Sequence, residues 1–284
     1  MFGFINILKP VGMTSFAVIA RLRKILGIKK IGHAGTLDPF AEGVLPIAVG
    51  KATRLIDFLS EEKEYIAKIQ FGADTDSYDI DGNIVKTYQK KVELFEIEEI
   101  LPKFIGNIAQ IPPKFSAIKQ NGKKLCDLAR KGQEIANIEP RNIHIENIKI
   151  LEFDEAKQTL KIQVKCSKGT YIRALGYDIG QELSCGAHLV ELIRTNSSGF
   201  LIENACSLED ENLYKKLENP LKYLNLPTFS IDEKALEKVV CGNNIKIEIE
   251  NLSDLILLYE DEIIAIGSVE NAVFTVKKVF YEKD

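Results

Sequence analysis

Several features are scarce or missing in this 284-residue sequence, and each absence excludes a class of protein. No apolar run is long enough to cross a membrane, and the first residues lack the basic-then-apolar pattern of a signal peptide, so we expect a cytoplasmic protein. The five cysteines are widely spaced and include no Cys-x-x-Cys pair, which predicts reduced thiols rather than a disulfide framework or a zinc site. Internal repeats and low-complexity tracts are also missing.

A net positive charge is missing too: the formal net charge is −4 and the pI is about 5.7. This argues at first sight against RNA binding, but the charge is unevenly distributed. Basic residues gather in two segments, and acidic residues gather after residue 205. The basic residues are Lys9, Arg21, Arg23, Lys24, Lys29, Lys30, Lys51 and Arg54, then Lys114, Lys119, Lys123, Lys124, Arg130, Lys131 and Arg141. Because RNA affinity depends on local neutralisation of phosphates, such a polarised surface can bind RNA. Ordinary solvated helix faces would explain either cluster alone.

The length and the 45% apolar content are sufficient for a full core, in one large domain and a small one. Expected strands and helices interleave irregularly, which favours an α+β fold with a mixed or antiparallel sheet. We predict strands at 4–8, 44–49, 65–71, 143–153, 160–166 and 189–194, and helices at 15–26, 52–59, 94–105, 127–130 and 171–183. Thr14 or Ser15 can cap the first helix, and Gly27 can end it.

A domain boundary is predicted near residue 227, where two Asn- and Pro-containing stretches occur and the composition turns acidic. Residues 1–227 would form the main domain, with a basic segment at about 111–146. Residues 228–284 would form a compact β-rich module with a short helix at 235–240 and four strands.

The segment 32–43, GHAGTLDPFAEG, is the most informative part of the sequence. Three glycines and a proline predict tight turns between two apolar runs, which would hold Asp38 rigidly. Such a loop is a typical position for a catalytic carboxylate. On this segment alone, a turn-forming role for Asp38 in an Asp-Pro pair is about equally plausible. One His and one Asp do not form a metal site.

The acidic segment 74–83 invites a calcium-binding interpretation, which we reject. Tyr78 stands where an oxygen ligand is needed, and no Glu closes a twelve-residue loop. The flanking segments are also predicted strands rather than helices.

An ordered set of motifs resembles the TruB family of pseudouridine synthases. The set comprises NILKPVGMTS at 6–15, GHAGTLDPFAEGVLPIAVGKATRL at 32–55, KEY at 63–65, residues 74–82, IPPKFSAIK at 111–119, GTYIR at 169–173, and CGAHL at 185–189 continuing to Arg194. Two positions depart from the family pattern: Cys126 stands where Tyr is usual, and Ile193 where Arg is frequent.

The resemblance implies a catalytic role for Asp38, with Arg173 as its cationic partner and Tyr65 stacking on the target base or moving a proton. Tyr65 on an alternating strand, Tyr171 and Leu192 could equally be core residues on sequence grounds. The resemblance implies that Tyr171 and Leu192 border the pocket and that Asp79 lies in a loop lining the cleft. It also implies that His33 enters the RNA loop where bases are extruded. Lys9, Lys123 and Lys124 are predicted RNA contacts.

The resemblance implies an isomerase that converts uridine 55 in the T loop of tRNA to pseudouridine, without a metal or cofactor. It further implies a monomer that recognises the T-arm stem-loop without a guide RNA, and a PUA-like C-terminal module. Two alternatives are a non-catalytic RNA-binding factor, which would not need Asp38, Tyr65 and Arg173 together, and a guide-RNA-dependent relative, which would carry a long basic tail. The module could also be a structural appendage. Attack of Asp38 on the sugar, attack on the base and a glycal intermediate all remain open.

Overall fold

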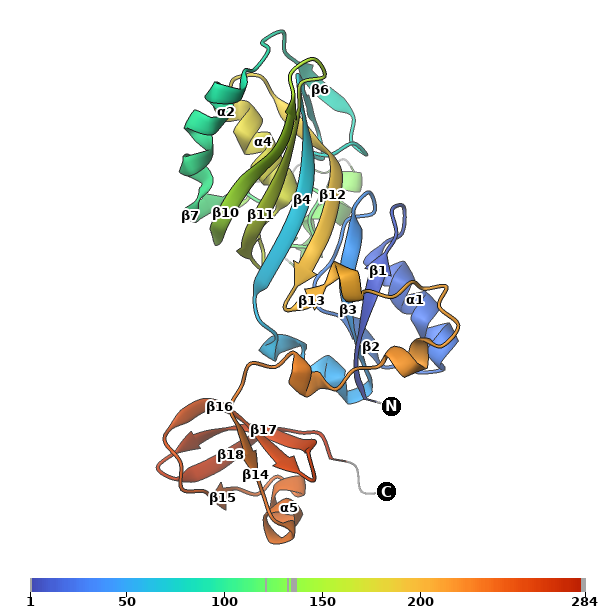
Figure 1. Cartoon of the computed structure of the whole chain (residues 1–284), viewed down its shortest axis with the longest axis vertical. Helices are drawn as coiled ribbons and strands as arrows, with labels where there is room; N and C mark the ends of the chain where they lie inside the picture. Colours follow the sequence, from blue (N-terminus) through green and yellow to red (C-terminus); the bar gives the residue numbers. More distant parts are fainter. Residues whose placement is uncertain (1, 121, 132, 134–136, 282–284) are drawn as a thin grey trace.

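A mixed nine-stranded sheet forms the larger part of the molecule (Figure 1), whose computed structural model describes residues 2–120, 122–131, 133 and 137–281. The strand order is β1-β3-β12-β4-β11-β10-β7, with β2 paired to β3 and β13 paired to β12. The strands are β1 Gly3–Lys9, β2 Ile31–His33, β3 Glu42–Val49, β4 Glu62–Phe71, β7 Gly106–Gln110, β10 Arg141–Asp154, β11 Thr159–Ser167, β12 Ala187–Ser197 and β13 Phe200–Leu201. The pairs are antiparallel except that β12 runs parallel to β3. The predicted α+β class is confirmed.

Helices α2 (Leu94–Ile100) and α4 (Ile172–Glu182) cover one face of this sheet and enclose the main apolar core. Helix α1 (Ser15–Leu26) packs at the other end, against β1 and β3. It begins and ends as the sequence predicts: the Thr14 hydroxyl accepts a hydrogen bond from the Ala17 amide, and Gly27 adopts a left-handed φ of 68°.

Two expected α-helices differ from the prediction: one does not form and the other is shorter. Residues 52–59 form two 3₁₀ segments, Gly50–Arg54 and Ile56–Phe58, instead of one α-helix. The helix expected at 94–105 ends at Ile100 and continues as the 3₁₀ segment Leu101–Phe104. Pro102 explains this change because it has no N–H to continue the α-helical hydrogen bonds.

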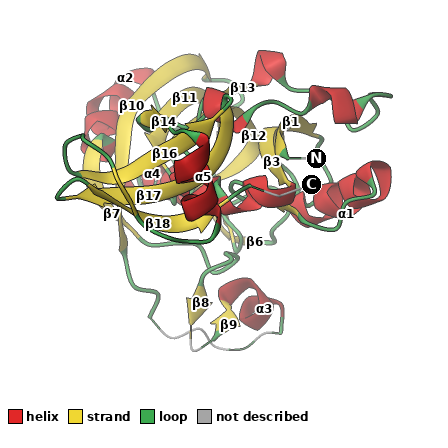
Figure 2. Cartoon of the chain, turned by 90° about the horizontal axis from the view of Figure 1, so that it is seen from below, coloured by secondary structure: helices red, strands yellow, loops and turns green. Residues whose placement is uncertain are grey.

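Small elements project from the sheet. Strands β5 (Ala73–Thr75) and β6 (Ile84–Thr87) form a hairpin over the acidic segment. The basic segment forms β8 (Lys119–Gln120), β9 (Lys123–Lys124) and α3 (Leu125–Arg130), which extend away from the body (Figure 2).

The C-terminal part is a five-stranded sheet with the order β14-β16-β17-β18-β15 and one helix. Its elements are β14 Thr228–Ser230, α5 Glu233–Val240, β15 Ile245–Lys246, β16 Leu252–Tyr259, β17 Glu262–Glu270 and β18 Val273–Val279. One apolar cluster is common to both sheets, with Ile256, Leu258 and Phe280 packed in the same core as Phe4 and Val44. The β-rich character of this part is confirmed; the division at residue 227 stays a prediction.

Candidate active site

Asp38 lies in the loop between β2 and β3, where backbone contacts fix its position. Gly35 and Gly43 flank this loop with φ values of 113° and 111°, which other residues rarely adopt. The Ala41 amide donates to the Asp38 carbonyl at 3.2 Å, and the Gly12 amide donates to the Pro39 carbonyl at 2.7 Å. The Asp38 side chain remains one third exposed, so its carboxylate faces open space from a rigid support.

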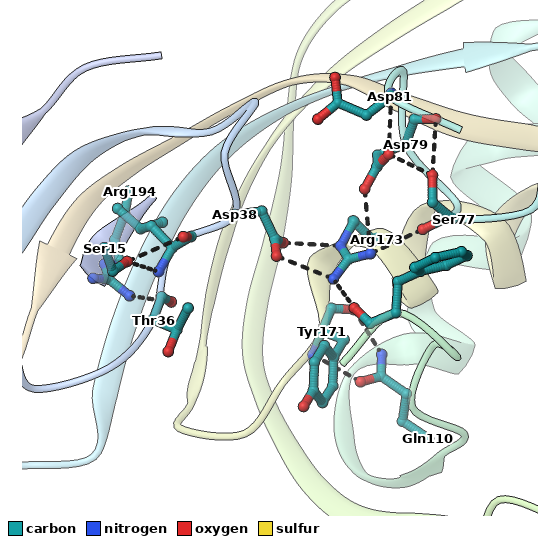
Figure 3. Close-up of polar contacts among 12 residues, drawn as sticks. Ser15, Thr36, Asp38, Ser77, Asp79, Asp81, Gln110, Tyr171, Arg173 and Arg194 are labelled. Carbon is teal, nitrogen blue, oxygen red and sulfur yellow. Dashed lines mark hydrogen bonds and ion pairs between the residues drawn. The ribbon is translucent and has the colours of Figure 1, made fainter. Parts of the chain in front are cut away.

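Arg173, at the start of α4, contacts this carboxylate although it is 135 residues away in the sequence (Figure 3). Its Nη2 donates to Asp38 Oδ1 at 3.1 Å, and its Nε lies 2.9 Å from Oδ2. The second contact is an ion pair without hydrogen-bond alignment, because Nε has no hydrogen-bond partner. The guanidinium is buried, with only 4% of the side chain exposed.

The remaining hydrogens of Arg173 hold the guanidinium from its other side. Nη1 donates to the Ser77 carbonyl at 3.0 Å and lies 3.2 Å from Asp79 Oδ2, while Nη2 also donates to the Phe115 carbonyl at 2.9 Å. Together with the two contacts to Asp38, the guanidinium makes three hydrogen bonds and two further ion-pair contacts, with five different oxygen atoms. A lysine ammonium has three hydrogens and could not make this set of contacts.

Asp79 is nearly inaccessible, and burial raises its pKa. A hydrogen bond from the Ser77 hydroxyl, 2.5 Å long, and the Arg173 charge act in the opposite direction. Asp74, in the same acidic segment, accepts from Tyr88 and Gln181 and is likewise buried. These carboxylates are therefore parts of a hydrogen-bonded network. Among the described residues, no group of three or more His, Cys, Asp or Glu is placed to hold a metal ion.

A cavity of about 270 Å³ opens beside Asp38 and Arg173. It brings together five of the predicted site residues, since Tyr65, Tyr171 and Leu192 also line it. Tyr65 and Leu192 are buried, with 8% and 5% exposed. Burial raises the pKa of Tyr65, so its hydroxyl is protonated at neutral pH.

None of the other predicted contacts whose side chains the structure describes lines this cavity. His33 is half-buried on β2, and burial lowers its pKa. Lys123 is exposed on β9, and the side chain of Lys124 lies outside the described part of the chain. Asp79 contacts the site only through Arg173.

Lys9, which was predicted to contact RNA, lies in the interior of the structure. Lys9 is fully buried, and its Nζ donates to the carbonyls of Pro10 at 2.8 Å, Met13 at 2.6 Å and Pro39 at 3.5 Å. Desolvation lowers its pKa to about 8. Lys9 instead joins the loop after β1 to the Asp38 loop.

Comparison with known proteins decides the family. A sequence model described as the TruB family pseudouridylate synthase N-terminal domain matches residues 23–172. A protein of Syntrophomonas wolfei named tRNA pseudouridine synthase B is 44% identical over 95% of this chain and 94% of its own length. The chain belongs to the TruB family. A second relative with that name, from Clostridium acetobutylicum, is 45% identical over 90% of this chain and 89% of its own length.

Solved structures extend the TruB likeness to the whole chain. A chain of a Cbf5-Nop10-Gar1 complex superposes with a TM-score of 0.74 at 29% identity, covering 99% of this chain and 85% of that chain. A chain of an H/ACA RNP bound to a substrate RNA containing 2′-deoxyuridine gives a TM-score of 0.73 at 27% identity, covering 100% and 86%. Within the described residues of the TruB chain, no helix is both long enough and apolar enough to span a membrane.

Two buried cations of the TruB cavity were not singled out from the sequence. Arg194 is 1% exposed and donates to the carbonyls of Val44 at 2.8 Å, Thr36 at 3.3 Å and Gly35 at 3.2 Å, which ties β12 to the Asp38 loop. Lys63 donates to the hydroxyls of two serines of the β12–β13 turn, and burial lowers its pKa to about 7. Both residues lie in motifs that resemble the TruB family, and this resemblance was the one sequence signal that could have identified them.

Proposed function

We propose that this chain is a tRNA pseudouridine synthase that isomerises uridine 55 in the T loop. The reaction breaks the bond between N1 of uracil and C1′ of the ribose and then joins C1′ to C5. The proton on C5 is lost and N1 gains one, so the product is an isomer and no oxidant is consumed. The observation that carries the proposal is the ion pair of Asp38 with Arg173 at the edge of the cavity that Tyr65 and Leu192 also line.

Asp38 is the catalytic carboxylate in this proposal because it is the one carboxylate among the described residues that line the cavity. Attack on C1′, attack on the base and the glycal route each require such a group. Arg173 keeps the carboxylate oriented through its two contacts with Asp38. Attack and orientation are therefore assigned to different residues.

Tyr65 and Leu192 are proposed to form the apolar walls that hold the uracil ring. A ring stacked on Tyr65 would lie within reach of its hydroxyl, which burial keeps protonated. We assign proton transfer to this hydroxyl. Tyr171 completes the wall on the side of α4.

The substrate is proposed to be the T-arm stem-loop of tRNA, bound by a monomer without guide RNA in the cytoplasm. C1′ and C5 are inaccessible while the base is stacked, so uridine 55 must be extruded into the cavity. His33 is proposed to fill space that the extruded bases vacate, because an imidazole can stack and hydrogen-bond. Lys123 and Lys124 are proposed to contact phosphates.

Incubation of the full-length protein with an unmodified T-arm stem-loop, with no other RNA or protein added, tests the function. We expect wild type to form pseudouridine, and Asp38→Asn to bind the stem-loop normally but form none. Asp261→Asn is the matched control: it removes the same charge from an exposed turn of the C-terminal sheet and should be fully active. Product formation by Asp38→Asn, or its absence with wild type, would contradict the proposal.

A further inference from the structure

Tyr78 has an unusual backbone conformation between two residues that hold Arg173. Its φ is 64°, in the left-handed region that side-chain-bearing residues rarely adopt. Ser77 contributes a carbonyl to Arg173 Nη1, and Asp79 contributes a carboxylate to the same nitrogen (Figure 3). Strain at such a position persists where the surroundings enforce it, and it is frequent at functional sites.

The left-handed turn at Tyr78 explains how neighbouring residues reach the same atom. Reversal of the chain at Tyr78 turns the Ser77 carbonyl and the Asp79 side chain toward Nη1, at 3.0 and 3.2 Å. The Leu189 amide donates to the Tyr78 carbonyl at 3.0 Å, and the Thr75 hydroxyl donates to the Asp79 carbonyl at 2.8 Å.

The side chain of Tyr78 is held by Tyr177. The two rings stack with centroids 4.0 Å apart and planes 17° apart. Tyr177 lies on α4 four residues after Arg173, so both project from the same side of the helix. The helix that carries Arg173 thus also carries the ring that grips the loop around Tyr78.

Neither tyrosine can take part in the chemistry directly, because neither lines the Asp38 cavity. They line a second groove, together with Phe115 and Lys114. Their effect on Asp38 must therefore pass through Arg173.

We propose that the stack of Tyr78 on Tyr177 positions Arg173 for the isomerase reaction assigned above. The stack holds residues 77–79 in the turn that fixes Nη1 of Arg173. Nε and Nη2 then point toward Asp38. Without it, the loop relaxes from the left-handed turn, the contacts to Nη1 weaken, and the guanidinium no longer fixes the carboxylate. Both tyrosines are positioning residues in this proposal, which rests on the proposed function.

Single-turnover assays of full-length variants on the T-arm stem-loop test this. Tyr177→Leu keeps apolar volume without an aromatic face, and we expect its rate constant to fall about 10–100-fold, as for a small misplacement of a catalytic group. The dissociation constant for the RNA and the melting temperature should stay near wild type. Tyr177→Phe keeps the stack and should restore the rate. Tyr214→Ala, at a half-exposed ring in the segment Leu213–Lys216, is the control for loss of a tyrosine.

A double-mutant cycle separates positioning from general destabilisation. If Tyr177 acts through Arg173, adding Tyr177→Leu to Arg173→Lys should cost little beyond Arg173→Lys alone. Multiplicative losses, a wild-type rate for Tyr177→Leu, or equal losses for Leu and Phe would overturn the inference. If Tyr177→Leu does not fold, Tyr78→Gly replaces it, because glycine accepts the φ of 64° but lacks the ring. A wild-type rate for Tyr78→Gly would likewise overturn the inference. An inactive wild type would instead refute the proposed function.

Discussion

The most constrained single residue is Arg173, whose guanidinium makes three hydrogen bonds and two further ion-pair contacts. We predict that Arg173→Lys lowers the rate constant by about 10²-fold or more, because a point charge cannot hold Asp38 and the Ser77–Asp79 loop at once. Single-turnover kinetics on the stem-loop measure this. Arg21→Lys is the matched control, since Arg21 makes one exposed ion pair with Glu209 and should tolerate lysine.

Tyr65→Phe separates the two roles of Tyr65, because phenylalanine keeps the ring and removes the hydroxyl. We predict that turnover falls about 10²–10⁴-fold while RNA binding changes little, as expected for loss of a proton-transfer group. The checks are the single-turnover rate constant and the dissociation constant of the same RNA. Survival of activity would restrict Tyr65 to stacking and packing.

Lys63 predicts a pH dependence of folding stability. Burial lowers its pKa to about 7, whereas in the unfolded chain it stays near the ordinary value of 10.5. Between these values the unfolded state binds more protons, so the free energy of unfolding contributed by Lys63 rises with pH. Relative to Lys63→Met, wild type should therefore gain at most about 1.4 kcal/mol per pH unit from pH 7 to pH 9. Urea denaturation of both proteins at several pH values measures this difference; a constant difference would contradict the assignment.

The sequence identified the central pair of the site, but it did not show which other charged residues are buried around that pair. Asp38 and Arg173 stand in motifs specific enough to pair residues 135 positions apart. Lys9, predicted as an RNA contact, is buried: its charge is visible in the sequence, whereas the three carbonyls that surround its ammonium are not. Arg194 was overlooked for the same reason. Its partners belong to a loop some 150 residues earlier, and a strand sequence does not reveal them.

At the scale of elements, local pattern was a good guide and strand order was not. Alternation predicted β4, β10 and β11, and a Thr cap and a Gly stop bounded α1. No local signal indicated that β12 inserts between β3 and β4, parallel to one and antiparallel to the other. That order is set by contacts between distant segments, and it brings Arg194 to the Asp38 loop.

Gly43 marks the contact between β3 and β12. A Cβ at this position would lie 2.3 Å from the Arg194 carbonyl oxygen and 2.7 Å from its amide nitrogen, and φ is 111°. We predict that Gly43→Ala lowers the free energy of unfolding by about 2 kcal/mol or more, through a clash with backbone and an unfavourable φ. Gly72→Ala is the control: φ is 103° but no heavy atom lies within 4 Å, so it measures the conformational cost alone. Equal losses in urea denaturation would show that the strand contact contributes little.

At the scale of the whole molecule, the two sheets are held together by an apolar cluster and by side chains that donate hydrogen bonds to main-chain carbonyls. The guanidinium of Arg54 lies over the Phe280 ring, 5.3 Å from the ring centroid. Arg54 also donates a hydrogen bond to the Val279 carbonyl at 2.7 Å. Lys278 reaches back to the Arg54 carbonyl at 2.9 Å. Since the cluster contains residues of both parts, deletion of the C-terminal part would expose apolar surface of the catalytic part. The module therefore supports the fold whether or not it touches RNA.

Charge distribution provides a test of which part of the molecule grips RNA. Lys123 and Lys124 lie on the projecting strand β9, whereas acidic residues outnumber basic ones after residue 228. We predict that replacing both lysines with Gln weakens tRNA binding and flattens the slope of log K against log salt by about one unit for each phosphate that is no longer neutralised. Turnover at saturating RNA should stay near wild type, because β9 belongs to a segment that extends away from the body of the molecule (Figure 2).

The matched control replaces Lys234 and Lys238, two exposed lysines of α5, with Gln. It removes the same charge from the C-terminal part, so a difference between the two double variants reports position rather than net charge. If the module is a structural appendage, the α5 variant should keep the wild-type salt slope and affinity. An equal loss in both variants would show that the C-terminal part also contacts phosphates despite its acidity. A net-negative module cannot attract RNA at long range, so a change in the slope of log K against log salt would have to come from direct phosphate contacts.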